Sequence, residues 1–130
     1  MAAVEPAVRE LAQGANFAAL TVHLPSGPAM THVMWVDADD DHVLINTEVH
    51  RDKFKAVERN PRVTVTVMDA SNPYHYAEVR GHVVEMVRGP EARAHIDALS
   101  QKYLGKDYDP TAIASERVIL RIAPDVQHVH

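Results

Sequence analysis

The stretch that decides the fold is residues 42–68, HVLINTEVHRDKFKAVERNPRVTVTVM, where the spacing of the apolar side chains changes twice. Residues 42–47 form an apolar run typical of a strand, and residues 50–60 then place apolar side chains at helical spacing. Residues 62–68 alternate between polar and apolar side chains, as a half-buried strand does. The stretch therefore predicts a strand, a short helix and a second strand.

The residues before this stretch predict one helix and two more strands. Residues 4–13 have helical spacing, and residues 17–24 and 29–37 are strand-like segments around the turn sequence PSGP at 25–28. Only short turns separate these two strands from each other and from the strand at 42–47. Short turns are typical of neighbouring antiparallel strands, so the three strands are expected to form a meander.

The second half of the chain completes a mainly β (α+β) pattern. Residues 76–87 predict a long strand with Gly81 inside it, where a bulge would help the sheet to close. A third helix is expected over residues 90–103, and a last strand over residues 118–122. Six antiparallel strands with flanking helices predict a small, partly open barrel.

Composition limits the classes of function. The 130 residues predict a single domain spanning 1–130, and 46% hydrophobic residues are typical of a globular protein. The net charge of -5 argues against a nucleic-acid partner. The absence of cysteine excludes disulfides and thiolate metal sites. No stretch approaches the ~20 apolar residues of a membrane span, and we expect a cytoplasmic protein without a membrane partner.

The junction between the strand at 42–47 and the following helix carries the clearest chemistry. Thr47 can donate a hydroxyl, Arg51 can hold two oxygens with its planar fork, and Lys53 adds a point charge. Cations are unfavourable at a helix N-terminus unless an anion is bound there. The pattern favours a phosphate site. The alternative interpretation is that Arg51 and Lys53 simply belong to the exposed first turn of an ordinary amphipathic helix.

Two possible metal patterns have simpler explanations. Asp37, Asp39 and Asp41 have the spacing of calcium-loop ligands, with Glu48 further on, but the glycine that such a loop needs is missing. A solvated turn over residues 37–41 is the better interpretation. The histidines at 128 and 130 lack a third ligand at a recognisable spacing, so we expect a frayed terminus and no metal site.

Several short motifs occur in a fixed order within residues 15–123. They are Asn46-Thr47-x3-Arg51-x-Lys53, Asn60-Pro61-Arg62-Val63, Asn72-Pro73-Tyr74-x-Tyr76 and the glycine of the next strand, Gly81. This order resembles the pyridoxamine-5'-phosphate-oxidase-like split β-barrel superfamily. The short chain, the strand end INT at 45–47 and the segment ERVILRIAPD at 116–125 are most similar to its actinobacterial branch, which uses the deazaflavin coenzyme F-420.

The resemblance implies an antiparallel six-stranded split β-barrel, a homodimer with the cofactor ring between subunits, and a set of cofactor-binding residues. By position these residues are Arg51 and Lys53 at the phosphate, Asn46 and Thr47 beside the ribityl chain, Thr31, His32 and Val33 along the ring, and Trp35, Tyr74 and Tyr76 in the pocket wall. His50 stands where FMN-using members usually have serine, which favours F-420 over FMN. No pair of basic residues is suited to pyridoxal phosphate.

The function implied by the resemblance is an F-420-dependent oxidoreductase that reduces a small organic acceptor by hydride transfer. Two alternatives stay open, an FMN-binding oxidase or reductase of the same fold and a non-catalytic protein that stores the cofactor. His32, His75 and Tyr76 could each deliver a proton to the product, and so could solvent. The sequence does not select a catalytic residue among them.

Overall fold

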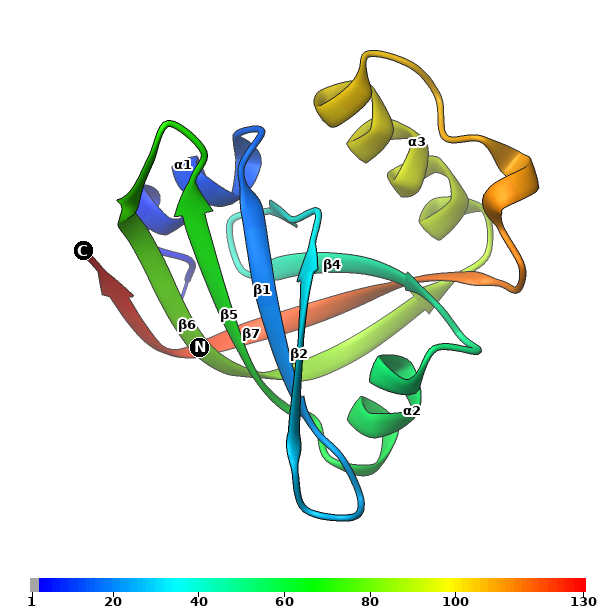
Figure 1. The fold of residues 1–130 in the computed structure, drawn as a ribbon, viewed down its shortest axis with the longest axis horizontal. Coiled ribbons are helices and arrows are strands. Elements are labelled where there is room, and N and C mark those ends of the chain that lie inside the picture. The colour runs from blue at the N-terminus through cyan, green and yellow to red at the C-terminus, as the bar shows by residue number, and fades with distance from the viewer. Residues whose placement is uncertain (1–2) are drawn as a thin grey trace.

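One curled antiparallel sheet dominates the computed structural model, which describes residues 3–130 (Figure 1). Its seven strands are β1 (Phe17–His23), β2 (Ala29–Met34), β3 (Asp37–Ala38), β4 (Val43–Glu48), β5 (Arg62–Asp69), β6 (Asn72–Arg88) and β7 (Arg117–Val129). Along the sheet they follow the order β2-β1-β5-β6-β7-β4-β3, and every pairing is antiparallel. The predicted split-barrel class is confirmed, with one short strand more than the six expected.

Three α-helices and a 3-10 turn flank the sheet in the described residues. They are α1 (Pro6–Gln13), α2 (Asp52–Arg59), α3 (Pro90–Leu104) and the 3-10 helix η1 (Pro110–Ala112). Proline stands at the start of α1 and α3, where its missing N–H costs no hydrogen bond, and Gly105 ends α3 in the left-handed conformation. None of the described helices has both the length and the apolar character needed to cross a membrane.

The position of β4 corrects the predicted meander. β1 and β2 do form a hairpin, but β4 lies on the other side of the sheet and pairs with β7 from Val43↔Ile122 to Glu48↔Arg117. Five of its six residues are buried. Strand β2 is largely exposed, so a place beside it would leave the apolar side chains of β4 in solvent. Figure 1 shows α2 and α3 on either side of β4.

The extra strand β3 lies inside the turn predicted over residues 37–41. Asp37 and Ala38 pair with Leu44 and Val43, and the Asp39 carboxylate accepts hydrogen bonds from the backbone N–H groups of residues 41 and 42. This carboxylate closes the turn together with the hydrogen bond that the Asp39 N–H donates to the His42 carbonyl at 3.0 Å. The predicted solvated turn is therefore present, but it is shorter than expected.

The C-terminus is ordered strand, so the expectation of a frayed tail is wrong. β7 pairs with β6 as far as Ala77↔Val129, and the His130 N–H donates to the Tyr76 carbonyl at 2.8 Å. The rings of His130 and Tyr76 also stack with centroids 4.6 Å apart. The predicted strand ends at residue 122 because Pro124 interrupts the strand pattern of the sequence. In the structure, pairing with the long strand β6 continues β7 past this proline.

Gly81 has the structural role expected from the sequence. The register between β6 and β7 shifts between Arg80 and Gly81, which identifies a bulge. A Cβ atom at this glycine would lie 2.2 Å from the Ala123 carbonyl oxygen. The close approach of the two backbones therefore requires glycine here.

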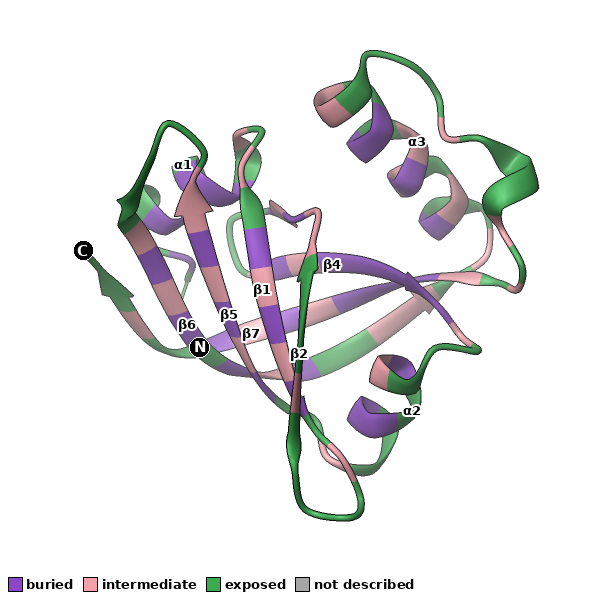
Figure 2. Cartoon of the chain, viewed as in Figure 1, coloured by how far each residue is buried: buried purple, intermediate pink, exposed green. Residues whose placement is uncertain are grey.

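The hydrophobic core is formed by the buried residues of the sheet, coloured purple in Figure 2, together with the buried faces of α1 and α2. Its largest fully buried side chains include Leu20, Ile45, Leu120 and Ile122, which come from β1, β4 and β7. Phe54 and Val57 of α2 are also buried in it. This packing fixes α2 against the sheet and thereby orients the other face of the helix.

Candidate functional site

A pocket of about 390 Å³ opens where β2, β4, α2, α3 and the start of β7 meet. Polar and cationic side chains line it together with a group of apolar and aromatic ones. The lining residues are Phe17, Val33, Met34, Trp35, Asn46, Thr47, Arg51, Lys53, Ile96, Tyr108 and Arg117. The pocket thus brings together six of the ten residues predicted for cofactor binding.

The cationic end of the pocket forms where β4 passes into α2. The Arg51 N–H bonds to the Glu48 carbonyl at 3.1 Å, which turns the chain, and Arg51 is the N-cap of α2. Phe54 anchors the helix in the core, and the adjacent residue Lys53 lines the pocket. Within residues 3–130 no carboxylate forms an ion pair with Arg51 or Lys53. These two cations are free to bind an anion.

The surroundings of Lys53 disfavour its own positive charge. Partial burial lowers the pKa of the Lys53 ammonium, and the positive charges of Arg51 and Arg117 lower it further. A bound anion would offset both the burial and the repulsion. Together with the buried Thr47 and the unpaired N–H groups at the start of α2, these cations fit a phosphoryl group.

Arg117 is a third cation in the pocket, and sequence reasoning missed it. Its side chain is only 10% exposed, and its Nη1 lies 3.4 Å from Glu48 Oε2. Its Nε donates to Asn46 Oδ1 at 2.8 Å, and its guanidinium lies 5.3 Å from the centre of the Tyr108 ring. The guanidinium is therefore held on several sides while it still lines the pocket.

Glu48 is a buried carboxylate that ties the loop before β7 to the end of β4. Its Oε1 accepts hydrogen bonds from the N–H groups of Ala114 and Ser115, both at 2.7 Å. Burial alone would raise the pKa of Glu48, but these two N–H groups and the charge of Arg117 hold it below its usual value. The carboxylate is thus kept ionised beside Arg117.

A hydrogen-bonded chain behind the pocket fixes the orientation of Asn46. Its Nδ2 donates to the Ala92 carbonyl at 3.0 Å and lies 3.1 Å from Nδ1 of His95, whose Nε2 lies 3.2 Å from the Asp37 carboxylate. Burial raises the pKa of Asp37, but the bond to His95, the Ala38 N–H and the charge of Lys102 lower it overall. The chain directs the oxygen of Asn46 toward Arg117.

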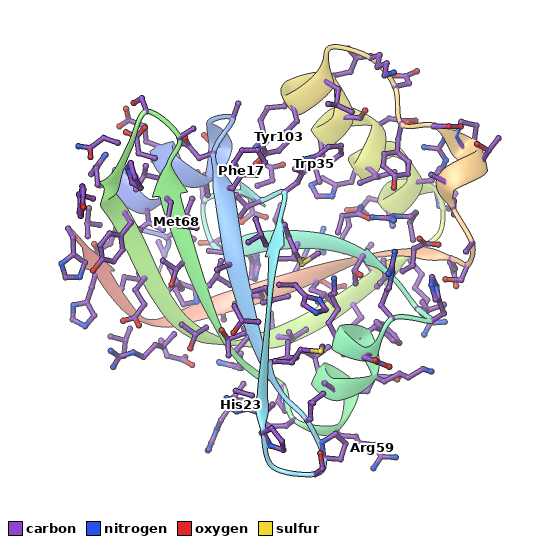
Figure 3. All side chains as sticks on the ribbon, viewed as in Figure 1. Phe17, His23, Trp35, Arg59, Met68 and Tyr103 are labelled. Atoms are coloured by element: carbon purple, nitrogen blue, oxygen red, sulfur yellow. The ribbon has the colours of Figure 1, made fainter. Side chains whose placement is uncertain are left out.

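Aromatic side chains form the other end of the pocket (Figure 3). Trp35 stacks on Tyr103 of α3 with ring centroids 5.0 Å apart and planes 5° apart, and Tyr103 also contacts Phe17 at 5.6 Å. Tyr108 meets the edge of Trp35 at 6.2 Å. Within a strand, Met34 and Trp35 would lie on opposite sides. Because β2 ends at Met34, this alternation does not extend to Trp35, and both side chains line the pocket.

Four predicted residues lie outside this pocket in the single chain. Thr31 is exposed on β2 and shares a hydrogen bond of 2.7 Å with Thr21, and His32 beside it is exposed as well. Tyr74 is 87% exposed near the start of β6, and Tyr76 stacks on the C-terminal histidine. Their predicted contacts with a cofactor would need a second subunit.

The other predicted histidines also lie away from the lining. His75 Nδ1 is 3.1 Å from the Asp69 carboxylate at the β5–β6 hairpin. His50 Nδ1 lies 2.6 Å from Ser115 Oγ, so the residue that departs from the FMN-type pattern holds the loop before β7. No His, Asp or Glu is among the residues that line the pocket.

The lining residues that sequence reasoning missed come from distant parts of the chain. They are Phe17, Met34, Ile96, Tyr108 and Arg117. The missed cation could have been found only from the strand pairing, because Glu48↔Arg117 is the last pair of β4 and β7. An arginine at the start of a strand carries no such signal by itself.

Comparison with known proteins supports the same family. Residues 4–130 match the pyridoxamine 5'-phosphate oxidase family. The chain belongs to that family. No curated protein sequence matches the chain significantly.

Solved structures of family-like folds cover nearly the whole chain. One described as an F-420 reductase is 29% identical, covers 96% of this chain and 98% of its own, and has a TM-score of 0.83. A conserved hypothetical protein of Mycobacterium tuberculosis is 20% identical over 97% of this chain and 83% of its own, with a TM-score of 0.77. A putative pyridoxamine 5'-phosphate oxidase of Listeria innocua is 18% identical over 95% and 92%, with a TM-score of 0.68, and shares the fold.

Proposed function

We propose that this family member is an oxidoreductase that binds coenzyme F-420 and reduces a small organic acceptor. The observation that carries the proposal is the convergence of Arg51, Lys53 and Arg117 at one end of a pocket that is aromatic at the other. A phosphorylated cofactor with a planar ring has this distribution of charge and apolar surface. The similarity to a structure described as an F-420 reductase favours the deazaflavin.

In the proposed complex, Arg51 and Lys53 bind the phosphoryl group, and the N-terminus of α2 adds its N–H groups. The Thr47 hydroxyl, at the end of β4, donates to the same region. Val33 and Trp35 lie along the ring. Each of these side chains sits on or beside a regular element, which is the arrangement that holds a ligand in one orientation.

When bound, a reduced deazaflavin supplies a hydride to an electron-poor acceptor. The residues of the chain bind and orient the two reactants and exclude water from them. Phe17, Met34 and Ile96 supply the apolar surface on which a small acceptor would lie. No carboxylate or imidazole lines the pocket of one chain, so the proton reaches the product from solvent, from the Tyr108 hydroxyl or from a residue of a second subunit.

We also propose that the active form is a homodimer. Val33 lines the pocket and is 70% exposed, so one wall of the pocket is open in a single chain. The strand that carries it, β2, is an exposed edge of the sheet. A second copy that covers this strand would close the pocket and bring its own exposed residues to the ring.

The test is a side-by-side titration of the purified apo-protein with F-420 and FMN, followed by the fluorescence of Trp35, the only tryptophan. Trp35 lines the pocket, so ligand binding is expected to quench it. Tighter binding of F-420 supports the proposal, and tighter binding of FMN would replace the deazaflavin by a flavin. If neither ligand binds, the proposed function is wrong.

A second measurement separates an enzyme from a cofactor-storage protein. The holo-protein with reduced F-420 is mixed with quinones and unsaturated carbonyl compounds under anaerobic conditions, and the return of the oxidised absorbance is recorded. Oxidation that depends on the acceptor and on the protein supports a reductase. Tight binding without acceptor-dependent oxidation by any compound of these classes would support storage instead.

A further inference from the structure

We infer that Arg117 is a third phosphate-binding residue and that Asn46 acts by holding it in place. The inference rests on the proposed function, since it concerns the same cationic end of the pocket. It changes the role expected for Asn46, which the family resemblance places beside the ribityl chain.

The hydrogen bonds of Asn46 leave no donor for a ligand. Its two amide hydrogens are directed at the Ala92 carbonyl and His95 Nδ1, and its oxygen accepts from Arg117 Nε. The reversed amide would place an NH₂ group against the Arg117 N–H and a lone pair against the Ala92 carbonyl. The side chain therefore has one satisfactory orientation, and in it the amide serves the guanidinium.

His95 and Asp37 make this orientation stable. His95 accepts at Nδ1 from Asn46, so its proton is on Nε2, where the Asp37 carboxylate lies 3.2 Å away. His95 is on α3 and Asp37 is on β3, so the chain of contacts joins three elements. A rigid support of this kind is what holds a binding side chain in a productive geometry.

The arrangement of Arg117 leaves part of its guanidinium for a ligand. Nε is occupied by Asn46 and Nη1 faces Glu48, whereas no hydrogen bond within residues 3–130 involves Nη2. Burial lowers the pKa of Arg117, and Arg51 and Arg93 lower it further, against the opposing effects of Tyr108 and Glu48. An anion between Arg51, Lys53 and Arg117 would relieve this repulsion.

The balance of charge favours a bound phosphoryl group. Arg51, Lys53 and Arg117 line this end of the pocket, and the buried carboxylate of Glu48 offsets one of their charges through Arg117. Two positive charges remain in excess. A phosphoryl group is negatively charged as a diester and carries about -1.5 to -2 charges as a monoester, so either form reduces this excess.

The experiment compares ligands that differ only in the phosphoryl group. Calorimetry gives the dissociation constants of FMN and riboflavin, and of the 5'-phosphate of the F-420 deazaflavin nucleoside and the nucleoside itself. For each pair, the ratio of the two constants is the affinity gained from the phosphoryl group. The variants are Arg117→Gln, Arg117→Lys, Asn46→Ala and the double variant Asn46→Ala/Arg117→Gln. The matched control is Arg121→Gln, on the same strand but paired with Glu85 and Glu91 outside the pocket.

We expect Arg117→Gln to reduce the gain by about tenfold or more, as loss of a charge-assisted contact does. Arg117→Lys is expected to recover part of it, and Arg121→Gln to leave it unchanged. Asn46→Ala should reduce the gain as well. In the double variant the loss should match that of Arg117→Gln alone, because both substitutions remove the same contact, the one between Arg117 and the phosphoryl group. Binding of the phosphate-free ligands reports that each variant is folded.

Three outcomes decide the inference. An unchanged gain in both Arg117 variants overturns it while the proposed function stands. Equal weakening of phosphate-bearing and phosphate-free ligands also overturns it, because it would show a general structural role. A wild-type protein that gains nothing from the phosphoryl group overturns the cationic site itself, and the inference with it.

Discussion

At the scale of single residues, the site depends on charges that the fold brings together without neutralising all of them. Lys53 is the clearest case, because it is half-buried and faces Arg51 and Arg117 rather than a carboxylate. Proteins seldom place cations this way without an anionic partner. The Arg-x-Lys pattern of the sequence thus leads to a property that can be measured, the lowered pKa of the Lys53 ammonium.

Lys53 gives a prediction about pH. Its pKa in the free protein is lowered by burial and by the two arginines, and a bound phosphoryl group raises it again. Binding should therefore take up a proton on the alkaline side, and affinity should fall as pH rises through the lowered pKa. Calorimetry in two buffers of different ionisation enthalpy measures the uptake. Lys53→Arg should abolish it, since a guanidinium does not titrate there. Uptake that persists in Lys53→Arg would assign the proton to another group.

At the scale of elements, local pattern predicted most strands and helices, and long-range pairing determined the rest. The alternation at 62–68 and the helical spacing at 50–60 gave β5 and α2 nearly to the residue. The sequence did not predict the pairing of β4 with β7, because the partner of a strand is not encoded in its own periodicity. Arg117 was missed for the same reason, whereas Arg51 and Lys53 belong to a local motif.

The bulge at Gly81 gives a prediction about the sheet. Gly81→Ala would place a Cβ 2.2 Å from the Ala123 carbonyl oxygen, so β6 and β7 would have to separate. We expect a loss of about 1–3 kcal/mol in the free energy of unfolding, measured by urea denaturation. Gly14→Ala is the comparison, because the nearest atom to its added Cβ is the end of the Asn16 side chain, and the backbone oxygens of Glu10 and Leu11 lie at ordinary contact distances of 3.4 and 3.7 Å. Equal stability of Gly81→Ala and the wild type would contradict the close approach of the two strands.

At the scale of the whole molecule, one chain supplies a cationic end, an aromatic end and an open side. Figure 2 shows β2 as a largely exposed strand, and its neighbour β1 alternates between buried and less buried residues. The four predicted residues that lie outside the pocket, two on β2 and two on β6, are also accessible in the single chain. Their assignment depends on how two copies assemble, which the sequence pattern of one chain does not specify.

The proposed homodimer predicts a defined oligomeric state. Sedimentation equilibrium should give twice the mass of the chain, 14.4 kDa. Val33→Asp places a charge on the exposed apolar part of β2, and it should weaken dimerisation by about tenfold or more, as an unpaired charge at an interface does. A wild-type protein that stays monomeric at high concentration would contradict the proposal.

The measurement that tests the account most directly is the dissociation constant of the preferred cofactor for Arg51→Ala/Lys53→Ala. Each lost charge-assisted contact is worth about 1.5–3 kcal/mol, so the double variant should bind at least about a hundredfold more weakly. Lys55→Ala, an exposed lysine on α2 outside the pocket, should bind like the wild type. The folded double variant with wild-type affinity would show that Arg51 and Lys53 are only the start of a helix.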